Sequence, residues 1–142
     1  MKNRLTIAIQ KSGRLSDQSK DLIRKSGINF STKGDKLLAK SNNLPIDILF
    51  VRDDDIPSLV SNGDADLAIV GENVLVEKTL YKKNNTFKVL DLGFSKCRLS
   101  IAAPNNKKNM RLANKKIATS YPNILKKYLD AVSYTHLTLP TN

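Results

Sequence analysis

The chain has 142 residues, which is enough for one domain with a hydrophobic core but too few for two domains of full size. Hydrophobic residues make up 40% of it and charged residues 26%, and every apolar run is far too short to cross a membrane. The net charge of +11 would suit a partner rich in phosphate. However, the Lys/Asn clusters carry no interleaved aromatic residues and Trp is absent, so a nucleic-acid-binding protein is not favoured.

Short apolar runs alternate with helix-like segments along the chain. Strands are predicted at residues 5–9, 37–39, 46–51, 65–70, 89–92, 98–103 and 116–119. Helices are predicted from Ser16 to the stop at Gly27, and at residues 56–60, 72–78 and 123–130. This alternation is typical of an α/β fold with a largely parallel sheet.

Local signals predict how two of the helices begin. Ser16 is a candidate N-cap for the first helix. Pro57 suits the first turn of the second helix, where its missing N–H costs little. Asp54 or Asp55 could cap that helix, and Asp53 to Asp55 could alternatively offer oxygen ligands to a metal; capping is the favoured interpretation.

The last twelve residues, 131–142, differ from the rest of the chain. They contain no Asp, Glu, Lys or Arg, although the preceding residues carry all 24 basic and 13 acidic side chains. A natural final strand would explain such a tail. The favoured hypothesis is a non-native extension of the kind that adapter DNA produces at the ends of some gene sequences.

Three turns that follow predicted strands carry polar groups suited to a ligand. Lys11, Gly13 and Arg14 follow the first strand, Arg52 follows the strand at 46–51, and Gly71, Glu72 and Asn73 follow the strand at 65–70. In a parallel sheet such turns meet at one edge, beside helix N-termini that favour anions. Together they could hold the phosphates, sugar and base of a nucleotide, although each alone is more often an ordinary solvated turn.

Other kinds of site receive less support. Cys97 lies between two cations, but the only histidine, His136, falls in the unusual tail, so cysteine catalysis is not expected. One Cys and one His cannot supply a zinc site, and the glycine-rich loops of P-loop and dinucleotide-binding proteins are absent from the sequence. The basic N-terminus shows no signal-peptide pattern, and the single Cys suits a reducing compartment, so a cytoplasmic protein is expected.

Over residues 4 to 130 the sequence resembles the long form of ATP phosphoribosyltransferase, the first enzyme of histidine biosynthesis. The strings that carry the resemblance are IAIQKSGRLSDQS, PIDILFVRDDDIPSLVSNGDADLAIVGENVL, CRLSIAAP and KIATSYPNILKKYLD. The resemblance implies a bilobal fold of the type II periplasmic-binding-protein kind, with a first lobe at 1–104 and an incomplete second lobe at 105–130. It also implies condensation of ATP with phosphoribosyl pyrophosphate (PRPP) in the presence of Mg²⁺, and assembly into homodimers or hexamers.

The same resemblance implies which residues bind the substrates. They are Lys11, Gly13, Arg14, Arg52, Gly71, Glu72, Asn73, Arg98, Thr119, Ser120 and Tyr121. The family's main PRPP loop is expected beyond Asp130, so the chain as given is expected to show negligible turnover, and Mg²⁺ is expected to arrive with the substrates. A two-lobed small-solute-binding module is the alternative function, because fold alone does not determine function.

Overall fold

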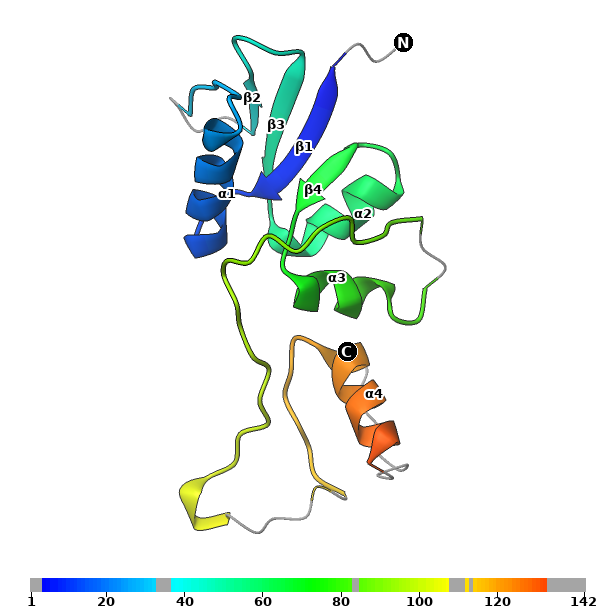
Figure 1. Ribbon diagram of the computed structural model, residues 1–142. Coiled ribbons are helices and arrows are strands. Elements are labelled where there is room, and N and C mark those ends of the chain that lie inside the picture. The colour runs from blue at the N-terminus through cyan, green and yellow to red at the C-terminus, as the bar shows by residue number, and fades with distance from the viewer. Residues whose placement is uncertain (1–3, 33–36, 83–84, 108–111, 113, 133–142) are drawn as a thin grey trace. The chain divides into compact units, whose positions relative to one another are not determined.

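The structure is a computed structural model that describes residues 4–32, 37–82, 85–107, 112 and 114–132 (Figure 1). The chain divides into two units, Met1–Ser95 and Lys96–Asn142. The predicted non-native tail lies outside the described residues except for Ala131 and Val132. The lobe boundary predicted at residue 104 stays a prediction.

The first unit is built on a four-stranded sheet with the order β2-β3-β1-β4. Its strands are β1 (Leu5–Gln10), β2 (Leu38–Lys40), β3 (Ile46–Val51) and β4 (Leu67–Ile69). The central strand β1 is parallel to both β3 and β4, and only the edge strand β2 runs antiparallel. The predicted α/β class with a largely parallel sheet is therefore confirmed, and the second unit adds no strand within its described residues.

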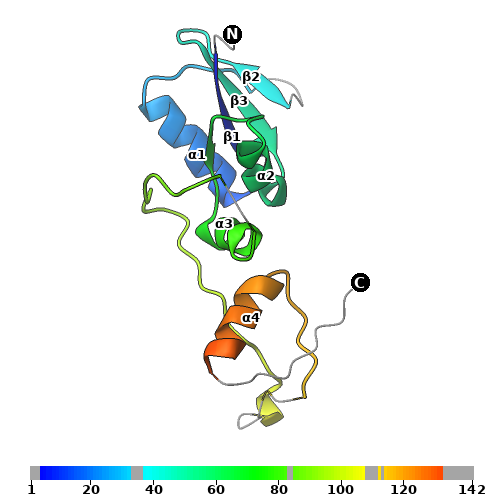
Figure 2. The same cartoon turned by 90° about the vertical axis from the view of Figure 1, so that its right-hand side faces the viewer.

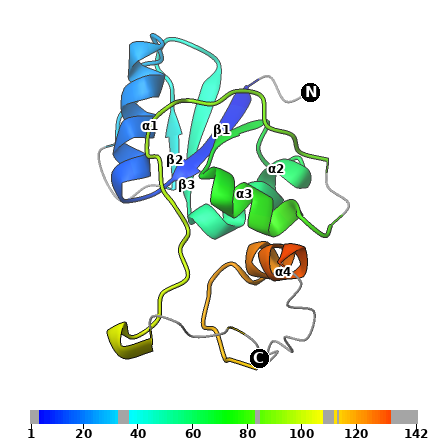
Figure 3. The same ribbon diagram turned by 60° about the horizontal axis from the view of Figure 1, so that its bottom comes forward.

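Helices cover both faces of this sheet, as Figures 2 and 3 show. They are α1 (Arg14–Lys25), α2 (Ile56–Ser61) and α3 (Glu72–Thr79), with a 3₁₀ turn η1 (Asp53–Asp55) before α2. Successive strand residues point to opposite faces. Ile9 accordingly packs in one core cluster with Ile23 of α1, whereas Ala8 packs in another with Ile56 of α2. The two helices therefore cover opposite faces of the sheet.

One of the two predicted helix caps is wrong. Helix α1 begins at Arg14 with Gly13 as its N-cap, two residues before Ser16. Ser16 is fully buried inside the first turn, and its hydroxyl has no hydrogen-bond partner among the described residues. Asp55, one of the two predicted candidates, is the N-cap of α2, although its side chain makes no capping hydrogen bond. Pro57 does lie in the first turn of α2, as predicted.

Three of the predicted strands are also wrong. Residues 89–92, 98–103 and 116–119 form no strand in the described structure. Their apolar side chains are exposed, with Val89 at 73% and Leu90 at 71%, except for Ile117, which is half-buried. An apolar stretch becomes a strand only when a neighbouring strand pairs with it and its side chains find a surface to pack on. No described residue supplies that pairing for these segments.

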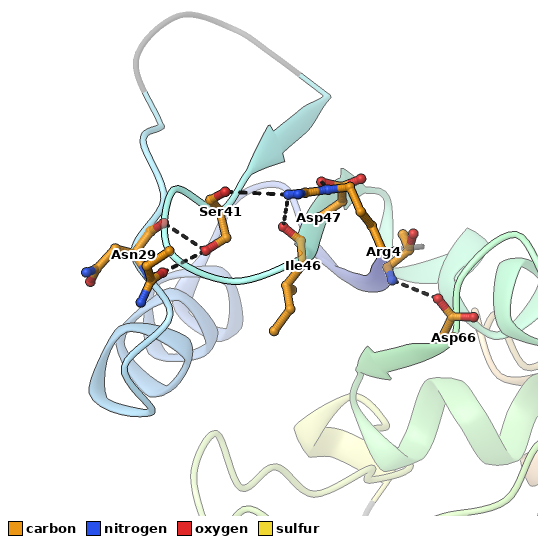
Figure 4. A network of polar contacts seen from close by, with 8 residues as sticks. Arg4, Asn29, Ser41, Ile46, Asp47 and Asp66 are labelled. Atoms are coloured by element: carbon orange, nitrogen blue, oxygen red, sulfur yellow. Dashed lines mark hydrogen bonds and ion pairs between the residues drawn. The ribbon is translucent and has the colours of Figure 1, made fainter. Parts of the chain in front are cut away.

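A polar network joins the chain segments at the amino-terminal edge of the sheet (Figure 4). The Arg4 Nε group donates to Asp47 Oδ1 at 2.8 Å, and its Nη2 group donates to the Ile46 carbonyl at 2.9 Å. This ion pair explains why an aspartate can interrupt the apolar run of β3. Asp66 accepts the Thr6 backbone N–H at 2.7 Å and returns its own N–H to the Thr6 carbonyl at 2.9 Å. The network therefore ties β3 and β4 to the start of β1.

We expect Asp66→Ala to lower the free energy of unfolding by about 1–3 kcal/mol, because the N–H of the buried Thr6 loses its acceptor. Asp66→Asn retains an acceptor oxygen and should cost clearly less. Urea denaturation of both variants measures the difference. Equal losses in the two would show that the acceptor at residue 66 is unimportant for stability.

The second unit contains a short 3₁₀ turn, η2 (Asn105–Lys107), and one helix, α4 (Pro122–Ala131). Leu125 and Leu129, four residues apart, are its buried side chains. The prediction of a helix at 123–130 is confirmed. Across the described ranges, no helix combines the length and the apolar character needed to cross a bilayer.

Candidate functional site

The carboxyl ends of three neighbouring strands meet at one edge of the sheet. Because β1 is parallel to β3 and β4, with Gln10 opposite Val51 and Ile9 opposite Ile69, the residues that follow these strands leave the same edge. The backbone N–H of Lys11 donates to the Val51 carbonyl at 2.8 Å, which holds the first two turns side by side. The structure thus brings together Lys11 to Arg14, Arg52, and Gly71 to Asn73, as the sequence predicts.

The chain also changes faces at this edge. After β1 it continues into α1 on one face of the sheet, and after the adjacent β3 it continues into α2 on the opposite face. In open α/β sheets, ligands bind outside the carboxyl ends of strands at such a topological switch point. Lys11 and Arg14 lie in the turn on the β1 side of this point, and Arg52 lies in the turn on the β3 side, so the two turns that flank it carry three basic residues.

The first turn is shaped by Gly13. Its φ of 94° is in the left-handed region, which glycine adopts without strain. Gly13 is also the N-cap of α1, and it has no side chain that could accept hydrogen bonds from the first helical N–H groups. Lys11 and Arg14 are exposed on either side of it. This turn therefore presents two cations and a helix N-terminus, a combination that suits an anion.

The second turn places Arg52 in an extended conformation directly before η1. Arg52 is exposed, and its carbonyl accepts the Asp55 N–H at 3.1 Å. Of the three carboxylates that follow, Asp54 lies 3.9 Å from the Lys78 ammonium. The described residues contain no cluster of three or more His, Cys, Asp or Glu that could hold a metal ion. The possible metal site at Asp53 to Asp55 thus receives no support from the geometry.

The third turn is shaped by its glycine in a different way. Gly71 has an ordinary negative φ of −63°, but a Cβ placed on it would lie 2.6 Å from Asn73 Oδ1. A side chain at residue 71 would force the Asn73 carboxamide to move, because non-bonded atoms do not approach so closely. Gly71 therefore allows Asn73 to fold back over the start of α3. Its carbonyl accepts the N–H groups of Val74 and Leu75, both at 3.0 Å.

Sequence reasoning missed one residue at this edge. The ammonium of Lys88 lies 2.9 Å from Glu72 Oε1 and 3.1 Å from Asp91 Oδ1. The hydrogen bond to Glu72 raises the pKa of Lys88, with a further contribution from Asp91. Lys88 is sixteen residues from Glu72 and directly precedes the strand predicted at 89–92, so no local sequence pattern indicated the contact.

The remaining predicted residues belong to the second unit. Arg98, Thr119 and Ser120 are exposed, and Tyr121 is half-buried as the N-cap of α4. The Tyr121 N–H donates to Thr119 Oγ1 at 2.9 Å, and this hydrogen bond stabilises the turn that precedes α4. Within the second unit, Thr119, Ser120 and Tyr121 form one turn, and Arg98 lies in an irregular segment earlier in the chain.

An open hollow of about 110 Å³ lies elsewhere, between α2 and α3. It is lined by Pro57, Ser58, Ser61, Asn62, Lys78, Thr79 and Lys82. None of the predicted site residues lines it. We therefore place the candidate site at the carboxyl edge of the sheet, where the polar turns converge, rather than in this hollow.

Comparison with known protein families matches residues 52–139 to the family HisG: ATP phosphoribosyltransferase. The chain belongs to this family. The matched segment begins at Arg52, directly after β3, and includes the turn at Gly71 to Asn73. It also includes Arg98 and the turn at Thr119 to Tyr121, so both units carry the family's pattern. The resemblance inferred from the sequence is confirmed.

A solved structure also resembles this member of the ATP phosphoribosyltransferase family. It is described as the ATP phosphoribosyl transferase (HisG:HisZ) complex from Thermotoga maritima, and the two chains superpose with a TM-score of 0.71 at 26% sequence identity. The alignment covers 96% of this chain and 63% of that chain. This match supports the predicted fold class, and it shows that the chain spans less than two thirds of that relative.

Proposed function

We propose that the whole protein is an ATP phosphoribosyltransferase, a pentosyltransferase that joins ATP to PRPP in the first step of histidine biosynthesis. In this reaction the N1 atom of adenine attacks the anomeric carbon of PRPP. The bond from that carbon to the pyrophosphate oxygen breaks, and pyrophosphate leaves with the bonding electron pair. Family membership, together with the cationic turns at one switch point, is the observation that supports this proposal.

The described residues are suited to the binding half of this reaction. Both substrates are polyanions, so their approach must be stabilised by positive charge. In our proposal Lys11, Arg14 and Arg52 supply that charge, and the N-terminus of α1 adds backbone N–H groups beside Gly13. Negative charge grows on the pyrophosphate as it leaves, and fixed cations stabilise that charge in the transition state. The chemistry makes little demand on protein acid–base groups.

The third turn is proposed to face the base and ribose of ATP. Gly71 permits a close backbone approach, and Glu72 and Asn73 offer hydrogen-bonding groups at the start of α3. Arg98, Thr119, Ser120 and Tyr121 are proposed as further substrate contacts on the strength of their match to the family. Mg²⁺ is proposed to enter with the substrate phosphates, and no step is assigned to a protein-held metal.

Titration of the 142-residue chain with ATP by isothermal calorimetry tests this proposal. We expect saturable binding of ATP, and weaker binding of adenosine because it lacks the phosphates that the cations hold. The chain covers only 63% of the length of the solved relative. Measuring ATP binding therefore tests the described residues more directly than measuring turnover, which would depend on the whole enzyme. Pyrophosphate release from ATP and PRPP should be negligible for this chain, and robust release would contradict that expectation.

Calorimetric titration with other ligands distinguishes the alternative functions from the proposed one. A small-solute-binding module should bind an amino acid or inorganic ion and ignore ATP. A nucleic-acid-binding protein should bind DNA or RNA with a steep dependence on salt concentration. Either result in the absence of ATP binding would contradict the proposed transferase. We also propose that the complete protein forms homodimers or hexamers, and its molecular mass from analytical ultracentrifugation tests this.

A further inference from the structure

The first turn of α1 contains a buried hydroxyl group that the chain leaves without a partner. Ser16 is fully buried, and its Oγ atom has no hydrogen-bond partner among the described residues. Buried polar side chains are nearly always hydrogen-bonded, because a group that leaves water without gaining a new partner destabilises the folded chain. The exception at Ser16 therefore calls for a partner from outside the described chain.

Ser19, one turn further along the same helix, shows what a buried serine does when a partner is at hand. It is as fully buried as Ser16, and its Oγ donates to the Leu15 carbonyl, four residues earlier, at 2.6 Å. Ser16 has no equivalent carbonyl within the helix, because α1 begins at Arg14 and the residue four positions earlier is Ser12, in the turn. The hydroxyl without a partner is thus the one nearest the start of the helix.

Ser16 lies on the side of α1 that faces the sheet. Ile23, on the same buried face of the helix, packs in one core cluster with Ile9 near the end of β1 (Figure 1). The Cα–Cβ bonds of a helix tilt toward its N-terminus, so the Ser16 side chain leans toward Gly13, the N-cap. Gly13 has no side chain that could meet it. The Ser16 hydroxyl is therefore directed into the start of α1.

The backbone at the start of α1 offers further donors. The N–H of Asp17 donates to the Gly13 carbonyl at 3.2 Å and begins the helical ladder. The N–H groups of Arg14, Leu15 and Ser16 precede it, and the helix contains no carbonyl one turn earlier for them. A phosphoryl group can accept hydrogen bonds from such N–H groups and from a hydroxyl at the same time. A phosphoryl oxygen is therefore the partner that suits the Ser16 hydroxyl.

We propose that Ser16 is a phosphate-binding residue whose hydroxyl donates a hydrogen bond to a phosphoryl oxygen of the nucleotide at the start of α1. Rotation about the Cα–Cβ bond turns Oγ from its covered position toward the bound phosphate. Lys11 and Arg14 supply charge around the same anion, and Ser16 adds a neutral donor from the sheet side of the helix. This inference deepens the proposed function and rests on it, because it takes the phosphate to be that of ATP.

A packing role for Ser16 predicts a different pattern. A small side chain lets α1 lie close to the sheet, but alanine would do so without burying an unpaired hydroxyl. If size alone mattered at this position, Ser16→Ala would leave ligand binding unchanged. If an ordered water molecule bonded the hydroxyl in the ligand-free chain, Ser16→Ala would lower stability. Binding and stability measured on the same variant therefore distinguish the roles.

The test is calorimetric titration of the 142-residue chain and its Ser16→Ala variant with ATP, inorganic tripolyphosphate and adenosine. We expect the Kd for ATP and for tripolyphosphate to rise about tenfold, the low end of the range for one hydrogen bond to a charged group. The Kd for adenosine should be unchanged, because adenosine has no phosphate. Ser16→Cys retains a side chain of similar shape with only a weak donor, so it should lose affinity for both phosphates as well. The urea midpoint of ligand-free Ser16→Ala should be unchanged or higher, since the unpaired hydroxyl is gone.

Ser19→Ala is the matched control, because it removes the same hydroxyl from the same buried face of the same helix. The Ser19 hydroxyl already bonds the Leu15 carbonyl, so the Kd for ATP and for tripolyphosphate should be unchanged. Equal losses in Ser16→Ala and Ser19→Ala would mean that a loosened helix, and not a missing donor, weakens binding. That result would overturn the proposal.

The other contrary results are distinct from one another. An unchanged Kd for both phosphates in Ser16→Ala removes the role of Ser16. A lower urea midpoint for ligand-free Ser16→Ala shows that the hydroxyl already has a stabilising partner, and an equal loss for adenosine shows that the effect does not come from the phosphate. If ATP binds and only the Ser16 result fails, the proposed function stands. If tripolyphosphate binds with the expected dependence on Ser16 but ATP does not bind, the phosphate site stands and the proposed function falls. If neither binds, both fall.

Discussion

Replacing Arg14 by alanine is expected to weaken ATP binding by about 10-fold to 100-fold, the usual value of one hydrogen bond to a charged group. Arg14 is the first residue of α1 and is exposed beside the switch point between β1 and β3. A guanidinium there can bind a phosphate through two parallel hydrogen bonds, in addition to the N–H groups of the helix start. Calorimetric titration at one fixed salt concentration measures the change, because the contribution of charge depends on ionic strength.

Lys25→Ala is the matched control for Arg14→Ala. It removes the same charge from the same helix, but from its last residue, which is also exposed. The 12-residue helix separates the two positions by more than a Debye length at physiological salt. ATP affinity should therefore stay within about twofold of the unmodified chain. Equal losses in both variants would mean that only net charge matters, and the site at the carboxyl edge would be contradicted.

The parts of the fold that were predictable are those determined by local pattern together with burial. The apolar run at 46–51 forms β3 with the predicted bounds, because β3 is an interior strand of the sheet and helices cover both faces of that sheet. The turns at Lys11 to Arg14 and at Gly71 to Asn73 were predicted because glycine and polar residues follow apolar runs. Parallel pairing of β1 with β3 and β4 places these turns at the carboxyl edge of the sheet. The location of the candidate site could therefore be predicted once a parallel sheet was expected.

The parts that were not predictable depend on contacts between distant segments. Residues 89–92 have the composition of a strand, but strand formation depends on a partner that composition does not reveal. The contact between Lys88 and Glu72 joins two segments through long side chains, and no periodicity indicates it. The start of α1 was placed too late because Ser16 is a good capping residue, whereas Gly13 and the buried helix face determine where the helix begins.

Ile48→Ala is expected to reduce the free energy of unfolding by about 2–5 kcal/mol, the usual cost of truncating a large buried aliphatic side chain. Ile48 is fully buried at the middle of β3, opposite Ile7 of β1 and Ala39 of β2. It belongs to the same core cluster as Ile23 of α1, so the cavity would loosen both the sheet and the helix that carries Arg14. Urea denaturation followed by far-UV circular dichroism measures the loss.

Two further variants make the Ile48 result specific to the core. Ile48→Val removes one methylene group and should cost about 0.5–1.5 kcal/mol. Val89→Ala removes a similar amount of apolar surface from a side chain that is 73% exposed, and it should leave stability within about 0.5 kcal/mol. If Ile48→Ala cost no more than Val89→Ala, the β2-β3-β1-β4 sheet would not be the cooperative core of the chain in solution. Domains of this size are stable by only about 5–15 kcal/mol, so the loss expected for Ile48→Ala would leave a large unfolded fraction at mild urea concentrations. Because ATP is expected to bind the folded state alone, it should raise the urea midpoint of this variant.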